Sequence, residues 1–176
     1  MRSSLIIFEY LNDNDIVWIH QACRKVDIAS RKVVIESGKP NQDIYILLEG
    51  KCRVEADDGR ALDVLISGDI VGEVSFVDRR KTTMRVTADS NAVLACLDGE
   101  VLSAKLASDA PFAARFYRGI ASVLAFRLRR NLQTAFSKGS DVLSGAYEFV
   151  GEIDAVDLDV TAKAGERLSY LLSRLM

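Results

Sequence analysis

The sequence predicts a mainly β fold, a barrel or jelly roll, with helices before and after it. Between Val26 and about Asp98, short β-branched runs alternate with turns that contain glycine and aspartate, which is the pattern of antiparallel strands. Many strands at this spacing are typical of a barrel or jelly roll. On either side of this region, apolar residues recur at helical spacing instead. The β-branched runs are Val33–Ile35, Ile44–Leu48, Leu62–Ile66 and Ala92–Leu97.

A short helix is expected near the start of the chain. Four residues that suit a helix N-terminus, Asn12 to Asp15, precede the apolar run Ile16–Ile19. A side chain among them can cap the free backbone N–H groups, and the carboxylates of the first turn favour the positive end of the helix dipole.

A hairpin is predicted within the β region at Asp58-Gly59, which lies between the runs 51–56 and 61–66. A two-residue type I′ turn needs positive φ, which aspartate tolerates and glycine prefers. We therefore expect a type I′ turn at this position.

A long helix over residues 111–137 follows the β region. Pro111 suits its first turn, where a backbone N–H has no partner to lose. The apolar residues that recur along it are Phe112, Phe116, Ile120, Val123, Leu124, Leu128, Leu132 and Phe136. Such a helix is about 39 Å long at 1.5 Å per residue. Because that length exceeds what one small domain covers, we expect one end to pack on the barrel and the other to form a homodimer through helix 111–137.

The remaining residues, 138–176, are expected to form an acidic linker and a short amphipathic helix. Every charged residue from Asp141 to Asp159 is acidic, and Leu168, Leu171, Leu172 and Leu175 then mark one apolar face. The sequence thus divides into a domain of residues 1–137, which includes the long helix, and this tail.

Composition narrows the classes of function. The chain has 176 residues with 23 Lys and Arg against 25 Asp and Glu, so its net charge of −2 argues against nucleic acid as a partner. No run of about 18 apolar residues provides a membrane span. The first residues do not resemble a signal peptide, and three unpaired cysteines indicate a reducing, cytoplasmic location.

An enzyme is not expected. His20 is the only histidine, and the sequence shows no nucleophile and base at a meaningful spacing. Cys23, Cys52 and Cys96 are too far apart in sequence for a zinc site, so we expect neither a metal nor a cofactor.

One segment within the β region carries the signs of a ligand site. Residues 67–76 interrupt the strands with two glycines, an acid and small residues. Gly72 allows close approach of a ligand, and a helical turn after it would direct the N–H groups of Glu73, Val74 and Ser75 at an anion. A carboxylate at Glu73 could accept a ribose hydroxyl, although it could equally cap the turn.

The stretch from Leu11 to about Phe136 resembles the cyclic nucleotide-binding domain of the cyclic AMP receptor protein, kinase regulatory subunits and gated channels. The segments that carry the resemblance are Leu11–Ile19, Val34–Gly38, Tyr45–Gly50 with Val54, Ser67–Asp69 and Gly72–Phe76. The resemblance covers about three quarters of the chain. It implies an eight-stranded jelly-roll barrel, a double-stranded β-helix, with flanking helices and a bound cyclic nucleotide.

The resemblance also implies roles for individual residues. Glu73 matches the acid that binds the ribose 2′-hydroxyl, while Gly72, Val74 and Ser75 match backbone positions that face the cyclic phosphate. The phosphate-binding arginine of the family falls on Thr82, and Thr83 matches a position that often supplies a hydroxyl. Losing the charged contact is expected to weaken binding about ten- to a hundredfold.

Other cations could replace that arginine only from nearby positions. Arg79, Arg80 and Lys81 precede the strand, where a solvated loop is the simpler interpretation, and alternation along the strand points Arg85 away from Thr82. Three further arginines, Arg127, Arg129 and Arg130, are expected to form a solvated face of the long helix.

Three hypotheses remain open on sequence alone. The first is a regulatory module that senses a cyclic nucleotide or related anionic ligand weakly or atypically. The second is a ligand-free relative that serves as an oligomerisation scaffold or binds a protein partner. The third is a dimer in which the C-terminal helix folds back and occupies the ligand site. Because only 39 residues follow Ser137 and a winged helix-turn-helix needs on the order of 70, no DNA-binding domain is expected.

Overall fold

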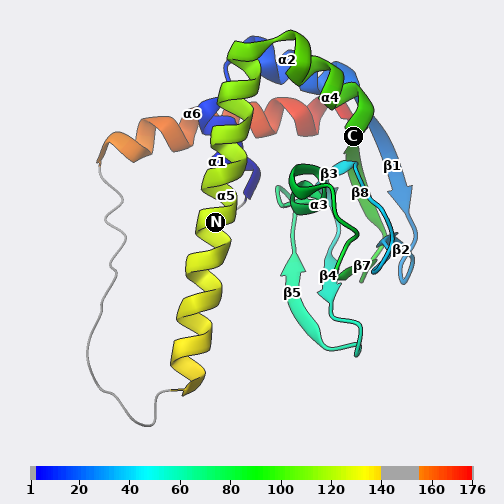
Figure 1. Cartoon of the computed structure of the whole chain (residues 1–176). Helices are drawn as coiled ribbons and strands as arrows, with labels where there is room; N and C mark the ends of the chain where they lie inside the picture. The colour runs from blue at the N-terminus through cyan, green and yellow to red at the C-terminus, as the bar shows by residue number, and fades with distance from the viewer. Residues whose placement is uncertain (1–2, 140–154, 176) are drawn as a thin grey trace.

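The computed structural model describes residues 3–139 and 155–175 (Figure 1). Eight strands form two four-stranded antiparallel sheets, ordered β1-β8-β3-β6 and β2-β7-β4-β5. This confirms the mainly β, jelly-roll architecture with flanking helices. The strands are β1 (Cys23–Ile28), β2 (Val33–Ile35), β3 (Ile44–Glu49), β4 (Cys52–Glu55), β5 (Ala61–Leu65), β6 (Ile70–Val71), β7 (Arg85–Ala88) and β8 (Ala92–Leu97).

The two central strands of the first sheet, β3 and β8, are buried on both faces. Side chains alternate along a strand, so Leu47 points into the space between the two sheets while Ile46 and Leu48 join the core beneath the helices. On the neighbouring strand β8, Leu94 faces the barrel interior and Ala95 faces the helices. The barrel and the helical layer therefore share this sheet as a common wall.

The hairpin between β4 and β5 forms, but its predicted type I′ turn is wrong. Gly59 has φ +81°, whereas Asp58 is not among the described residues with positive φ. The loop closes through bonds from Gly59 N–H to Ala56 O (2.9 Å) and from Ala56 N–H to Arg60 O (3.0 Å). The connection is thus longer than two residues, and glycine is needed at one position only.

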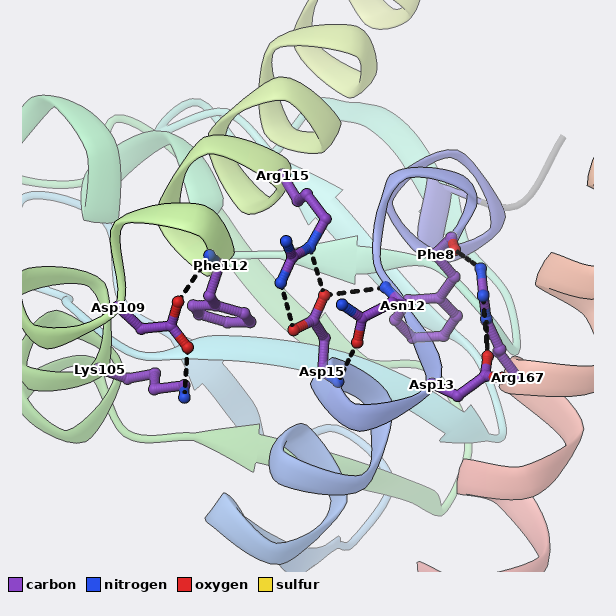
Figure 2. A network of polar contacts seen from close by, with 9 residues as sticks. All are labelled: Phe8, Asn12, Asp13, Asp15, Lys105, Asp109, Phe112, Arg115 and Arg167. Atoms are coloured by element: carbon purple, nitrogen blue, oxygen red, sulfur yellow. Dashed lines mark hydrogen bonds and ion pairs between the residues drawn. The ribbon is translucent and has the colours of Figure 1, made fainter.

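Two helices precede the barrel, α1 (Ser3–Tyr10) and α2 (Asp13–Ala22). The predicted cap of α2 is confirmed: Asn12 accepts from the N–H of Asp15, and the Asp15 carboxylate accepts from the N–H of Asn12. Asp15 also binds Arg115 through both carboxylate oxygens, at 2.7 and 2.8 Å (Figure 2). Because Arg115 comes from the long helix α5, this pair fixes α2 against α5.

The helices after the barrel are α4 (Gly99–Ser108), α5 (Ala110–Gly139) and α6 (Ala155–Leu175). The first half of α5 is packed, with Phe112, Phe116 and Ile120 buried, but Leu128 and Leu132 are 60% and 46% exposed. Figure 1 shows the second half of α5 running beside β5 and away from the other helices. The homodimer through α5 stays a prediction, which sedimentation velocity would check.

The last helix, α6, packs chiefly against α1 and α2. Its apolar face contributes Ala164, Leu168 and Leu171 to the helical core. An amphipathic helix is therefore present, but with 21 residues it is longer than the short helix predicted, and it begins at Ala155, within the predicted acidic linker. Residues 140–154 of that linker lie outside the described residues. None of the helices in the described ranges has the length and apolar character that crossing a membrane requires.

Candidate ligand site

The segment singled out in the sequence forms a tight turn between β6 and the short helix α3 (Glu73–Asp78). Gly72 is the N-cap of α3 and has φ +96°, in the left-handed region. A Cβ at this position would lie 2.3 Å from the carbonyl oxygen of Asp43. Only glycine therefore allows the backbone to enter α3 here. We refer to residues 72–83 as the cassette.

Glu73 is buried and is held by an arginine from the long helix. Its side chain is 1% exposed, and its Oε1 accepts a hydrogen bond from Arg127. The same guanidinium donates to the carbonyl oxygen of Ile70. Burial raises the pKa of Glu73, and the positive charge of Arg127 opposes that rise. The pair joins the start of α3 to α5.

The second carboxylate oxygen of Glu73 has no hydrogen-bond donor among the described residues. Oε2 is buried and accepts no hydrogen bond from any described residue. A buried carboxylate oxygen without a donor is costly, so a hydroxyl that reached it would gain a charge-assisted bond. This fits the role that the sequence predicts for Glu73.

The remaining cassette positions differ in what their side chains do. Val74 is 53% exposed, whereas Ser75 is buried and donates its hydroxyl to the carbonyl oxygen of Gly72 at 3.1 Å. The Asn41 side chain donates to both Ser75 Oγ (3.3 Å) and Asp43 O (2.8 Å). The Ser75 hydroxyl therefore fixes the first turn of α3, and the role predicted for its backbone towards a phosphate stays a prediction.

Thr82 lies against the turn that follows β2. Its hydroxyl is within hydrogen-bond distance of the carbonyl oxygens of Glu36 and Lys39, at 2.5 and 3.0 Å. Backbone bonds join Thr82 to Gly38 and Lys39 in the same place. Thr83 is exposed. No hydrogen bond within residues 3–139 joins either threonine to Gly72–Ser75.

The positively charged side chains near Gly72–Ser75 either contact other groups or are exposed to solvent. The Arg79 guanidinium lies 5.6 Å from the Phe76 ring centroid and donates to Ser103 on α4 at 3.3 Å. Arg85 pairs with Glu36 at 3.6 Å. Arg80 and Lys81 are exposed, as expected for a solvated loop.

The interpretation of Arg127 as part of a solvated face is wrong, because its side chain reaches Glu73. Arg130 likewise pairs with Asp63 on β5, while Arg129 is exposed. A signal for Arg127 existed in the sequence. The buried residues Phe116, Ile120 and Val123 are spaced by four and three, and the next inward position is 127.

A cavity of about 210 Å³ lies between β5 and α5, beside Arg127 and the ion pair of Arg130 with Asp63. It is lined by Ser3, Asp63, Val64, Leu65, Ile66, Asp69, Phe126, Arg127 and Arg130. Within the described residues, no group of three or more His, Cys, Asp or Glu side chains is arranged to hold a metal ion.

The helix α6 has α1 and α2 as its main partners rather than α3, which speaks against its filling the ligand site of its own chain.

Comparisons with known proteins agree with this architecture. The family model of the cyclic nucleotide-binding domain matches residues 25–109. The CRP-like cAMP-activated global transcriptional regulator of Mycobacterium tuberculosis is 27% identical over 128 residues, covering 70% of this chain and 55% of that protein. The chain thus spans about half the length of this relative.

Two solved structures share the fold. The N-terminal domain of a transcriptional regulator from Streptomyces coelicolor A3(2) is 25% identical, with a TM-score of 0.60 and coverage of 80% of this chain and 95% of that one. A cyclic nucleotide-binding domain from Methylobacillus flagellatus KT is 16% identical, with a TM-score of 0.70 and coverage of 82% and 85%.

Proposed function

We propose that this chain, which resembles the cyclic nucleotide-binding domain over residues 25–109, is a CRP-like regulatory module that senses an anionic small ligand at its cassette. The ligand class is a cyclic nucleotide or a related phosphate compound. The observation that carries the proposal is the contact between Glu73 on the cassette and Arg127 on α5. A ligand on the cassette would act directly on a residue that the long helix already holds.

The mechanism is a shift between two arrangements of α5. A ribose hydroxyl that donates to Glu73 Oε2 shares the carboxylate with Arg127, so the ligand changes how tightly Glu73 holds the helix. A ligand shifts such an equilibrium only by its difference in affinity for the two arrangements. The exposed half of α5, with Leu128 and Leu132, would carry the change outward, and a second copy of the chain is the proposed partner there.

Weak binding is part of the proposal, because the resemblance places Thr82 at the position where the family has its phosphate-binding arginine. We expect calorimetric titration with cyclic AMP, cyclic GMP and cyclic dinucleotides to show binding to at least one of them, at micromolar to millimolar concentration. Absence of heat for every ligand at millimolar concentration would contradict the sensor.

A second candidate, a ligand-free scaffold, is favoured by the contacts of Thr82. Its hydroxyl already serves the turn at Glu36–Lys39, which is a structural use of the position. In the same titration, the Thr82→Arg variant is expected to bind about ten- to a hundredfold more tightly than the parent, because it restores a charged phosphate contact. Lys81→Arg, which adds a guanidinium but no charge, is the control. Binding by Thr82→Arg alone would favour the scaffold for the natural chain.

A further inference from the structure

The first turn of α1 is fastened to the segment that leads into the cassette. Ser3 Oγ accepts from the N–H of Ile70 at 2.8 Å and donates to Asp69 Oδ1 at 3.2 Å. The N–H groups of Ser3 and Ser4 donate to Asp69 Oδ1 (3.2 Å) and Gly68 O (2.9 Å). Four hydrogen bonds therefore hold α1 to residues 68–70, directly before the Gly72 turn.

The last turn of α1 is fastened to α6. Arg167 donates to the carbonyl oxygen of Phe8 at 2.7 Å, one of the carbonyls that a helix C-terminus leaves without an internal partner. Its Nε and one terminal nitrogen donate to Asp13 Oδ1 at 2.9 and 2.8 Å. Figure 2 shows Arg167 reaching both groups from α6. The arginine side chain is 11% exposed and that of Asp13 is 76% exposed, so the bond to Phe8 is the sheltered one, while the pair with Asp13 faces solvent.

Packing makes α1 a stiff connection between its two ends. The helix has eight residues, about 12 Å at 1.5 Å per residue, and Ile6, Ile7 and Phe8 are buried. It crosses α5 so closely that a Cβ on Gly119 would lie 3.0 Å from the Cα of Ile7. A closely packed helix of this length moves as a unit rather than bending at one end.

We propose that α6 is a regulatory helix whose docking on α1 and α2 is coupled, through α1, to residues 68–70. These residues lie just before the cassette in the chain, and we call them the entrance of the cassette. Coupling between two sites is reciprocal, so loosening α6 changes the entrance and changing the entrance alters the docking of α6. Ala164, Leu168 and Leu171 supply the apolar contact of the docked helix, and Arg167 is the polar link to α1. The coupling itself does not depend on the proposed function. The identity of the ligand that would drive it rests on the proposed function.

Hydrogen exchange of the full chain, without ligand, tests the coupling. Arg167→Ala is expected to raise amide exchange about tenfold in residues 162–175, because α6 loses three charge-assisted bonds. It is also expected to raise exchange severalfold in residues 66–71 at the far end of α1. The control is Arg174→Ala on the same helix, whose guanidinium lies over the Tyr170 ring of α6 itself. We expect this control to leave residues 66–71 unchanged.

The reciprocal variant, Ser3→Ala, removes the two hydroxyl bonds of the four that join α1 to residues 68–70, and it should raise exchange in residues 162–175. Residues 92–97 of β8 report on global unfolding. If Arg167→Ala also raises exchange in β8, the fold as a whole has been destabilised. The test is then repeated with Asp13→Asn, which weakens the pair with Arg167 without removing the arginine. Faster exchange of α6 with unchanged residues 66–71 would overturn the coupling, as would unchanged α6 in Arg167→Ala. Because no ligand is used, failure of the coupling is distinct from failure of the sensor.

Discussion

Replacing Arg127 by methionine is expected to lower the free energy of unfolding by about 3–5 kcal/mol near pH 7.5, which is the typical cost of leaving a buried charge without its partner. Methionine keeps much of the apolar stem of arginine but cannot neutralise Glu73, whose side chain is 1% exposed. Urea denaturation followed by circular dichroism measures the change. The control is Arg129→Met, because Arg129 is exposed on the same helix and its loss should change stability by less than about 0.5 kcal/mol.

The loss in Arg127→Met should also depend on pH in a defined direction. Burial raises the pKa of Glu73, and removing Arg127 takes away the charge that opposes that rise. A carboxyl with a raised pKa in the folded state binds its proton more tightly folded than unfolded, so acidification stabilises the fold through this group. The variant should therefore regain part of its lost stability as the pH falls towards 5. A loss that grows on acidification relative to the parent would contradict a charged, buried Glu73.

Gly72→Ala is expected to cost more than about 3 kcal/mol and to abolish any binding at the cassette. The added methyl would lie 2.3 Å from the carbonyl oxygen of Asp43, in addition to the strain of a left-handed residue. The backbone must then shift, and the first turn of α3 shifts with it.

The matched control is Gly38→Ala. Gly38 also has positive φ, +73°, but its added Cβ meets no atom within 4 Å. Its cost should therefore be the strain alone, about 1–2 kcal/mol. Equal destabilisation of the two variants in thermal unfolding would show that close approach to Asp43 is not what requires glycine at position 72.

What the sequence predicts well is what neighbouring residues decide. The cap of α2 at Asn12 and Asp15 involves groups three residues apart, and the packed first half of α5 follows from one repeating pattern. The hairpin at Asp58-Gly59 was predicted for the same reason. Its turn type was predicted wrongly, because the backbone bond from Ala56 to Arg60 closes a loop longer than two residues, which the dipeptide does not reveal.

What the sequence does not predict is which distant polar groups meet. Arg127 lies 54 residues from Glu73, and Arg167 lies 154 residues from Asp13. The spacing of the buried residues on α5 places Arg127 on the inward face, but neither segment alone shows which distant group its arginine reaches. The docking of α6 was undecided for a similar reason, since an apolar stripe shows that a helix packs but not on what.

The central claim is that the cassette acts on α5 through the contact between Glu73 and Arg127. The most direct measurement is hydrogen exchange in residues 120–133, with and without the cyclic nucleotide that gives the strongest heat in the titration. We predict that saturating ligand changes exchange in these residues in the parent chain, and that Arg127→Met binds the ligand with little or no such change. Ligand binding that leaves residues 120–133 of the parent unaltered would contradict the claim.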